Sequence, residues 1–264
     1  MTPNQPSDAW GQGDAYERYI GRWSRPAAGA FLAWLALPAG LDWLDVGCGT
    51  GALSQAVLDG CAPASVTGVE PASGFREATL QRLGTRVTIL AGDAQDIPLA
   101  DATLDVVVSG LMLNFVTDPV AGLVEMARIL RPGGTLAAYV WDYAGRMDLI
   151  RIFWDVAVAL DPAASQYDEG LRFPLCNPDP LVATFAQAGL EDVTVQAIDV
   201  PSLFTDFNDF WQPFLGATGP APGYVASLSK PNRAALRDEL AARLPVASDG
   251  AISLLARAWA VRGS

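Results

Sequence analysis

Short apolar runs alternate with amphipathic stretches through the first half of the chain. Five runs have the length and composition of buried strands: LDWLDVG (41–47), ASVTGVE (64–70), RVTILAG (86–92), DVVVSGL (105–111) and GTLAAYVW (134–141). Helical spacing separates most of them, at about 52–58, 72–83 and 118–130. Strands that alternate with helices in this way predict a parallel sheet with helices on both faces, which is a doubly wound α/β fold.

Helical spacing also occurs outside this alternation. Two helical stretches precede the first strand, near 13–22 and 26–37, and the second of them ends at Pro38. After Trp141 the pattern loosens, and helices are expected at about 147–160 and before Ala188.

Two further strands are predicted near the end of the chain, EDVTVQAIDV (191–200) and ISLLARAWAVRG (252–263). Between them lie about 50 residues rich in Phe, Trp, Gly and Pro, and a connection of this length is usually functional or a small subdomain. The sequence therefore predicts a helical N-terminal cover (1–40), a ligand-binding core (41–200), a lid insertion (201–250) and the final strand of the core (251–264).

A glycine-rich turn, DVGCGTG (45–51), lies between the first strand and its helix. Gly47 and Gly49 let a ligand approach the backbone without meeting a Cβ, and the amides at the start of the helix favour an anionic group. Gly47, Gly49 and Ala52 also satisfy the dinucleotide pattern G-x-G-x-x-[GA]. Glu70 ends the second strand, where nucleotide-binding folds place an acid against ribose hydroxyls. At this point a nicotinamide dehydrogenase remains an open alternative.

Three further segments distinguish between the classes of nucleotide-binding enzyme. GDAQDIP (92–98) follows the third strand, SGLMLNF (109–115) ends the fourth, and EMARILRPGG (125–134) leads into the fifth. Together with YERYIGRWSRPAAGAFLAWL (16–35), and in this order, they resemble the class I S-adenosylmethionine-dependent methyltransferases, specifically their ubiquinone/menaquinone-biosynthesis-like (methyltransferase type 11) branch. The likeness covers about residues 16–141 and depends on the joint pattern, whereas a dehydrogenase leaves GDAQDIP unexplained.

The resemblance implies a Rossmann-like sheet of seven strands with an antiparallel last strand, and S-adenosylmethionine bound across the carboxyl ends of the first four. The residues that it implies as cofactor contacts are Gly47, Cys48 and Gly49 beside the methionine part, Glu70 at the ribose, Pro71, Asp93 and Ala94 at the adenine, and Ser109, Gly110 and Leu111 near the ammonium group. Tyr19, Arg22 and Arg25 are candidates for binding the carboxylate, in a helix that these enzymes fold over the cofactor.

Charge and composition exclude several other partners. The net charge is −12 and no Lys/Arg cluster is present, so neither nucleic acid nor an anionic membrane is expected as a partner. Histidine is absent, which removes Ser-His and Cys-His nucleophiles and His-based metal sites, and no metal site is predicted. The three cysteines match no disulfide framework and the N-terminus lacks a signal-sequence pattern, so a cytoplasmic location is expected.

The acceptor side is expected to be covered by residues 142–178 and the 201–250 insertion. Phe173 and Trp211 are expected to line the acceptor pocket, because aromatic walls suit an apolar or aromatic acceptor; the alternative is that these rings only pack the insertion onto the sheet. Methyl transfer from a sulfonium requires mainly alignment. If a base is needed, Asp142 and Tyr143 after the fifth strand are candidates, and the alternative is a solvated acid at the start of a loop.

The sequence therefore predicts an S-adenosylmethionine-dependent methyltransferase that acts on a small, apolar or aromatic molecule. Two alternatives retain the cofactor site: an enzyme with non-methylating chemistry, such as a cyclase or decarboxylase, and a regulatory protein that binds the cofactor without turnover. The sequence does not specify the acceptor, the methylated atom or the oligomeric state.

Overall fold

The computed structural model describes residues 21–216 and 219–264, and these fall into two compact units. The core unit contains Ser24–Trp141, Leu175–Ile198 and Ala258–Ser264. The helical unit contains Asp142–Pro174 and Asp199–Arg257, together with the described N-terminal residues up to Trp23. The four-part division expected from the sequence stays a prediction.

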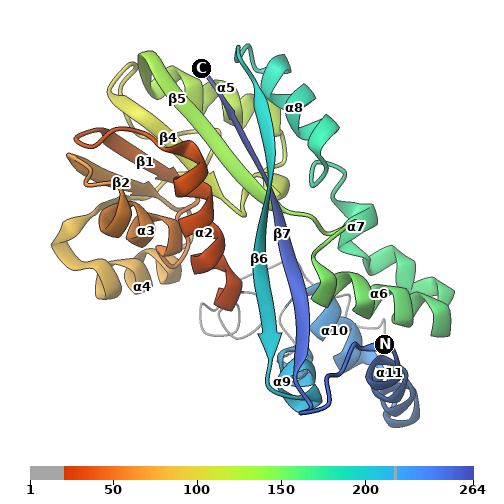
Figure 1. Cartoon of the computed structure of the whole chain (residues 1–264). Coiled ribbons are helices and arrows are strands. Elements are labelled where there is room, and N and C mark those ends of the chain that lie inside the picture. Colours follow the sequence, from red (N-terminus) through yellow and green to blue (C-terminus); the bar gives the residue numbers. More distant parts are fainter. Residues whose placement is uncertain (1–20, 217–218) are drawn as a thin grey trace. The chain divides into compact units, whose positions relative to one another are not determined.

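A seven-stranded sheet organises the core unit (Figure 1), with the strand order β3-β2-β1-β4-β5-β7-β6. The strands are β1 (Asp42–Val46), β2 (Ser65–Val69), β3 (Thr88–Leu90), β4 (Leu104–Gly110), β5 (Leu130–Trp141), β6 (Thr194–Phe204) and β7 (Ile252–Gly263). The first five pair in parallel, and β7 pairs antiparallel with β5. The predicted α/β fold with an antiparallel last strand is confirmed.

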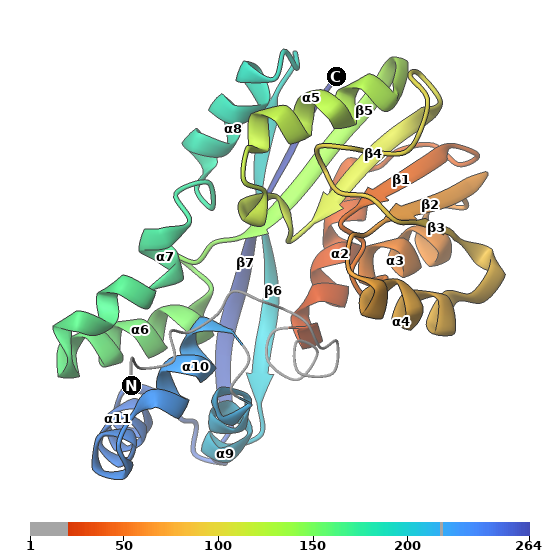
Figure 2. The same ribbon diagram turned by 180° about the vertical axis from the view of Figure 1, so that it is seen from behind.

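Helices cover both faces of this sheet. They are α2 (Arg22–Leu35), α3 (Ala52–Gly60), α4 (Ser73–Leu83), α5 (Pro119–Ile129) and α8 (Pro178–Gln187), with short 3-10 turns η2 (Gly84–Arg86) and η3 (Leu113–Phe115). In Figure 1 α2 lies in front of the sheet, whereas in the reverse view of Figure 2 α5 lies in front of it. Phe31 of α2 is fully buried, with its ring 4.7 Å from that of Tyr139 on β5. The core of this unit is therefore built on both sides of the sheet.

The helical unit is held together by aromatic side chains. Its elements are α6 (Asp148–Leu160), η4 (Pro162–Tyr167), α7 (Glu169–Arg172), α9 (Phe207–Trp211), η5 (Gln212–Leu215), α10 (Pro220–Ser227) and α11 (Lys230–Arg243). Phe153 of α6 stacks on Phe214 at 4.6 Å, and Phe210 also contacts Phe214. These three rings are fully buried, so residues 204–224 contribute to the core of this unit.

Helix α11 is an element that the sequence analysis does not predict. Ser229 caps it by accepting a hydrogen bond from the Asn232 amide, and only Leu236 and Leu240 of its side chains are buried. Apart from alanines and Pro231, these two leucines are its only apolar side chains in 14 residues, which makes a weak periodic signal and explains the omission. Elsewhere, β5 begins earlier and β6 ends later than predicted. Among the residues that the structure describes, no helix has the length and apolar character needed to cross a membrane.

Candidate functional site

The glycine turn follows β1 and adopts left-handed backbone conformations, with φ +70° at Gly47 and +53° at Gly49. The amides of Gly47 and Cys48 both donate to the carbonyl oxygen of Val69, which ties the turn to the end of β2. A Cβ placed on Gly49 would meet no atom within 4 Å, whereas one on Gly47 would lie 2.5 Å from Cγ of Met112. The turn therefore leaves open space in front of Gly49.

Glu70 fixes the position of this turn. Its side chain is buried; Oε2 accepts a hydrogen bond from the Gly49 amide at 3.0 Å and Oε1 accepts one from Ala72 at 2.9 Å. Thr79 of α4 donates to the Gly49 carbonyl at 2.6 Å. A carboxylate offers about four lone-pair positions, so Glu70 can hold the turn and still accept from two further hydroxyl groups.

Asp45 lies beneath the turn and is a site residue that the sequence analysis did not select. Burial raises its pKa to about 6, and Ser54 of α3 donates a hydrogen bond to it at 2.7 Å. The sequence signal that could have identified Asp45 is an acidic residue within an apolar strand, directly before the glycine turn. Burial likewise raises the pKa of the Cys48 thiol, and Asp45 and Glu70 add to the effect. A neutral buried thiol is a small packing residue rather than a nucleophile.

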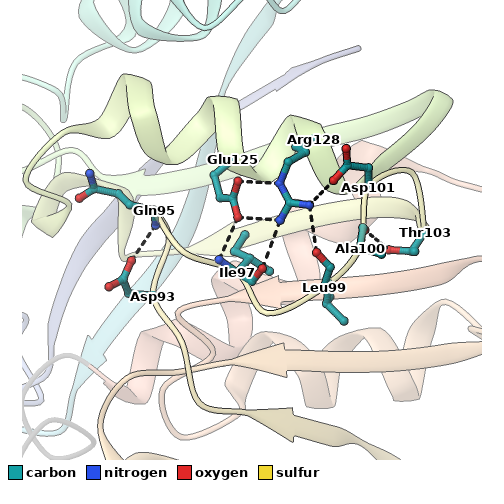
Figure 3. A network of polar contacts seen from close by, with 9 residues as sticks. All are labelled: Asp93, Gln95, Ile97, Leu99, Ala100, Asp101, Thr103, Glu125 and Arg128. Atoms are coloured by element: carbon teal, nitrogen blue, oxygen red, sulfur yellow. Dashed lines mark hydrogen bonds and ion pairs between the residues drawn. The ribbon is translucent and has the colours of Figure 1, made fainter.

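The Asp93–Ala94 segment forms a tight turn beyond β3. The Asp93 side chain is exposed, and its Oδ1 accepts a hydrogen bond from the Gln95 amide at 2.7 Å (Figure 3). Within the described part of the chain Oδ2 accepts none, so it remains available to a ligand. Ala94 is buried and lies against α5 at Gly122, where an added Cβ would be 3.5 Å from the Ala94 Cβ.

The end of β4 has an unusual backbone. Leu111 adopts φ +60°, a conformation that a leucine seldom takes, and its amide donates to the Tyr139 carbonyl at 2.8 Å. Ser109 is fully buried, and among the described residues its Oγ has no hydrogen-bond partner. A Cβ on Gly110 would lie 2.7 Å from the Tyr139 hydroxyl, so only glycine fits there.

The sheet register brings these four groups together. Val46 pairs with Val69, Val69 pairs with Leu90, and Asp45 pairs with Val108, so the strands that precede each group are neighbours with their carboxyl ends at one edge. The groups are Gly47–Gly49, Glu70–Pro71, Asp93–Ala94 and Ser109–Leu111. In a doubly wound fold this edge is where ligands bind.

The N-terminal candidates are placed differently. Tyr19 lies outside the described residues, and Arg25 is an exposed residue on α2. Arg22 donates to the Asp209 carboxylate at 3.0 Å and to the Leu203 carbonyl at 2.8 Å. Its guanidinium is therefore already bonded to groups of the helical unit.

The candidate acceptor-side residues belong to the helical unit. Asp142 is buried, and its two carboxylate oxygens accept from the amides of Gly145 at 3.0 Å and Arg146 at 2.9 Å, so it is not a solvated acid. The Tyr143 ring lies 5.9 Å from that of Phe173, which is half-buried. Trp211 is buried against the rings of Phe207 and Phe214.

Glu169 is a second buried acid that the sequence analysis missed. Its carboxylate accepts a hydrogen bond from the Trp154 indole, and burial raises its pKa to about 8. The preceding residue, Asp168, is paired with Arg151 at 2.7 Å. Nothing in the DEGLRFPL segment distinguishes a buried acid from an exposed one, because its environment is supplied by α6.

The residues at the sheet edge suit S-adenosylmethionine. The open space at Gly49 admits the chain of the cofactor, Glu70 retains lone pairs for a ribose, and Asp93 Oδ2 can accept from an adenine amino group.

Several known proteins resemble this chain. A family model described as a methyltransferase domain matches residues 44–138. The demethylmenaquinone methyltransferase of Roseiflexus castenholzii is 32% identical over 175 residues, which is 59% of this chain and 70% of that protein. The O-methyltransferase cnsE of Penicillium expansum is 29% identical over 201 residues, covering 74% of this chain and 64% of that protein.

Solved structures share the fold at lower identity. Haemonchus contortus phosphoethanolamine N-methyltransferase 2, in complex with S-adenosyl-L-methionine, aligns with a TM-score of 0.58 and 17% identity over 95% of this chain and 56% of that one. The [4+2]-cyclase SpnF aligns with a TM-score of 0.56 and 18% identity over 91% of this chain and 81% of that one.

The chain belongs to the class I S-adenosylmethionine-dependent methyltransferases, in their ubiquinone/menaquinone-biosynthesis-like branch. S-Adenosylmethionine is its cofactor and methyl transfer is its chemistry. The dehydrogenase alternative is thereby excluded.

Proposed function

We propose that this methyltransferase acts on a small apolar or aromatic acceptor in the cytoplasm. The observation that carries the proposal is the concentration of aromatic side chains in the helical unit, where the half-buried Phe173 lies beside Tyr143. A flat apolar ring suits an apolar or aromatic ligand, and the relative in Roseiflexus castenholzii is named for a quinone precursor. Cys48 and Cys61 form no disulfide in the part of the chain that the structure describes, which agrees with a reducing compartment.

In this proposal the core unit holds the cofactor at the carboxyl edge of its sheet. Gly49 provides the open approach, Glu70 accepts from the ribose hydroxyls, and Asp93 with the Ala94 amide reads the adenine edge. Gly47 and Cys48 lie beside the methionine part, Pro71 flanks the adenine, and Ser109, Gly110 and Leu111 face the ammonium end. Tyr19 and Arg25 bind the carboxylate.

S-Adenosylmethionine supplies a methyl group on a positively charged sulfur, and its thioether leaves without protonation. The chain's own residues therefore bind, orient and exclude water, and alignment can contribute about 7–11 kcal/mol. The absence of histidine is compatible with this chemistry. Where an acceptor must lose a proton, we favour Tyr143 over Asp142, because both Asp142 oxygens already accept backbone amides.

Transfer of labelled methyl groups tests the proposal. Purified enzyme with methyl-labelled S-adenosylmethionine should methylate members of a panel of phenols, quinols and apolar carboxylic acids, and should ignore polyamines and oligonucleotides. Phe173→Ala should raise KM for the best acceptor without changing cofactor affinity. Leu171→Ala is the matched control, since Leu171 lies on α7, which ends directly before Phe173, and is 68% exposed. Methylation of oligonucleotides alone, or equal effects of the two variants, would reject the proposed acceptor class.

SpnF, which shares the fold, is named a [4+2]-cyclase, so the experiment should also distinguish methyl transfer from a non-methylating reaction. The labelled-methyl experiment separates the two: a cyclase converts its substrate without transferring label.

A further inference from the structure

A cluster of polar contacts joins α5 to the segment between β3 and β4 (Figure 3). Arg128 of α5 donates to the carbonyl oxygens of Leu99 at 3.0 Å and Ile97 at 3.2 Å, and it is paired with Asp101. The Arg128 guanidinium also donates two hydrogen bonds, each of 2.7 Å, to the carboxylate of Glu125, which lies one helical turn earlier. Arginine is suited to this role, because its planar guanidinium carries five donors in fixed directions.

Glu125 completes the contact from the other side. Its Oε1 accepts a hydrogen bond from the Ile97 amide at 3.0 Å, so both backbone polar groups of Ile97 are bonded to the same pair of side chains. The Arg128 guanidinium holds the pKa of the Glu125 carboxyl below its usual range, which keeps this acceptor charged. The Ile97 side chain is 2% exposed, so the residue is fixed through its side chain as well as its backbone.

The segment that carries Ile97, residues 91–103, follows β3 and precedes β4. Within the described chain, its other backbone hydrogen bonds are short-range, from Asp96 to Asp93 and from Leu99 to Ile97, or lie at its far end, where Ala102 and Thr103 donate to Arg128 and Ile129. Ile97 directly follows the turn from Asp93 to Asp96. The position of Asp93 and Ala94 therefore depends on how firmly Ile97 is attached to α5.

We infer that Glu125 and Arg128 are positioning residues for adenine recognition: by fixing Ile97 they hold the Asp93–Ala94 turn where it meets the adenine edge. This inference rests on the proposed cofactor contacts of Asp93 and Ala94. It predicts that α5, which does not itself carry the glycine turn, affects selectivity for the base.

The chain offers a matched control in Arg131. This residue also bonds two carboxylates, Asp105 at 2.7 Å and Asp42 at 3.1 Å, and also lies in the core unit. Asp42 and Asp105 lie at the starts of β1 and β4, which is the opposite edge of the sheet from the cofactor site. Arg131→Lys and Arg128→Lys therefore make the same chemical change, but only Arg128 bonds the backbone of the segment that carries Asp93 and Ile97.

Calorimetric titration with two ligands tests the inference. One is S-adenosylhomocysteine, and the other is its purine riboside analogue, which lacks the 6-amino group. Wild-type enzyme should prefer the adenosyl ligand by at least about fivefold, the effect of losing one hydrogen bond to a charged acceptor. Arg128→Lys should lose most of this preference, by binding the adenosyl ligand more weakly and the analogue nearly as before. Arg131→Lys should retain it, and Arg128→Lys should cause no further loss in an Asp93→Ala background.

Each other outcome overturns the inference. Unchanged preference in folded Arg128→Lys, or an equal loss of both ligands, would mean that the pair is only structural. Glu125→Gln decides the question if Arg128→Lys does not fold, since it weakens the same contact while retaining an acceptor for Ile97. A wild-type enzyme that binds both ligands equally would instead show that Asp93 does not read the base, and the proposed cofactor contacts would fail first.

Discussion

At the scale of single residues, Gly49 makes the sharpest prediction. Asparagine tolerates left-handed backbone, so Gly49→Asn should fold, but its side chain would occupy the open space in front of the turn. We expect affinity for S-adenosylhomocysteine to fall at least about tenfold, in line with the cost of overfilling a fitted site. Gly40→Asn is the control, because Gly40 also has positive φ (+81°) and open space but precedes β1 at the other edge. Equal affinities in the two variants, measured by calorimetry, would make the turn purely structural.

Glu169 predicts a pH dependence of stability. Its pKa is raised to about 8 in the folded state, so between the ordinary value of 4.5 and about 8 the folded chain binds a proton that the unfolded chain lacks. This group's contribution to the free energy of unfolding is therefore greatest at low pH and falls as pH rises through that window, at up to about 1.4 kcal/mol per unit.

Glu169→Gln should remove much of this decline, since an amide can still accept from the Trp154 indole without acquiring charge. Urea unfolding between pH 5 and 8.5 measures the effect. The exposed Glu77 provides a control as Glu77→Gln. If wild type and Glu169→Gln show parallel pH profiles, Glu169 is not a buried carboxyl in solution.

At the scale of elements, the lid hypothesis can be tested by hydrogen exchange. In segment 201–224, the described residues beyond the end of β6 at Phe204 form the short elements α9 and η5 and the start of α10, although Phe204, Phe210 and Phe214 are buried. Short helices have few protected amides, so we expect this segment to exchange faster than β4 in the free enzyme and to slow when cofactor and acceptor are both bound. Trp211→Ala should lower turnover while cofactor affinity stays near wild type. If the amides of segment 201–224 exchange as slowly as those of β4 both with and without the ligands, the segment is part of the rigid core.

The elements also show what the sequence does and does not reveal. Strands β1 to β5 and their helices were predictable because each is a continuous apolar run or an amphipathic stretch, and the ends of parallel strands share an edge. Helix α11 was missed because only Leu236 and Leu240 face inward. The bonds from Arg128 to Ile97 and Leu99 could not be predicted, since they join residues about 30 positions apart through backbone carbonyls that any residue carries.

At the scale of the whole molecule, the division into two compact units predicts which part of the chain is stabilised by cofactor binding. Apart from Tyr19, the proposed cofactor contacts all belong to the core unit. A ligand at 100 times its dissociation constant stabilises the state that binds it by about 2.7 kcal/mol. S-Adenosylhomocysteine should therefore slow amide exchange by about 100-fold in β1 and β4 and leave α11 nearly unchanged. Equal protection of α11 would mean that the units unfold as one.

The boundary between the units passes through β6 and β7, after Ile198 in one strand and before Ala258 in the other. Asp199 and Arg257, the first residues on the far side, form an ion pair at 2.7 Å. A chimaera that takes residues 199–257 from a relative should therefore cut both strands at these two positions and carry both members of the ion pair with the graft, and exchange of the whole helical unit also requires residues 142–174. With cuts at these positions, the same cofactor-binding sheet could be combined with segments from relatives that methylate other acceptors.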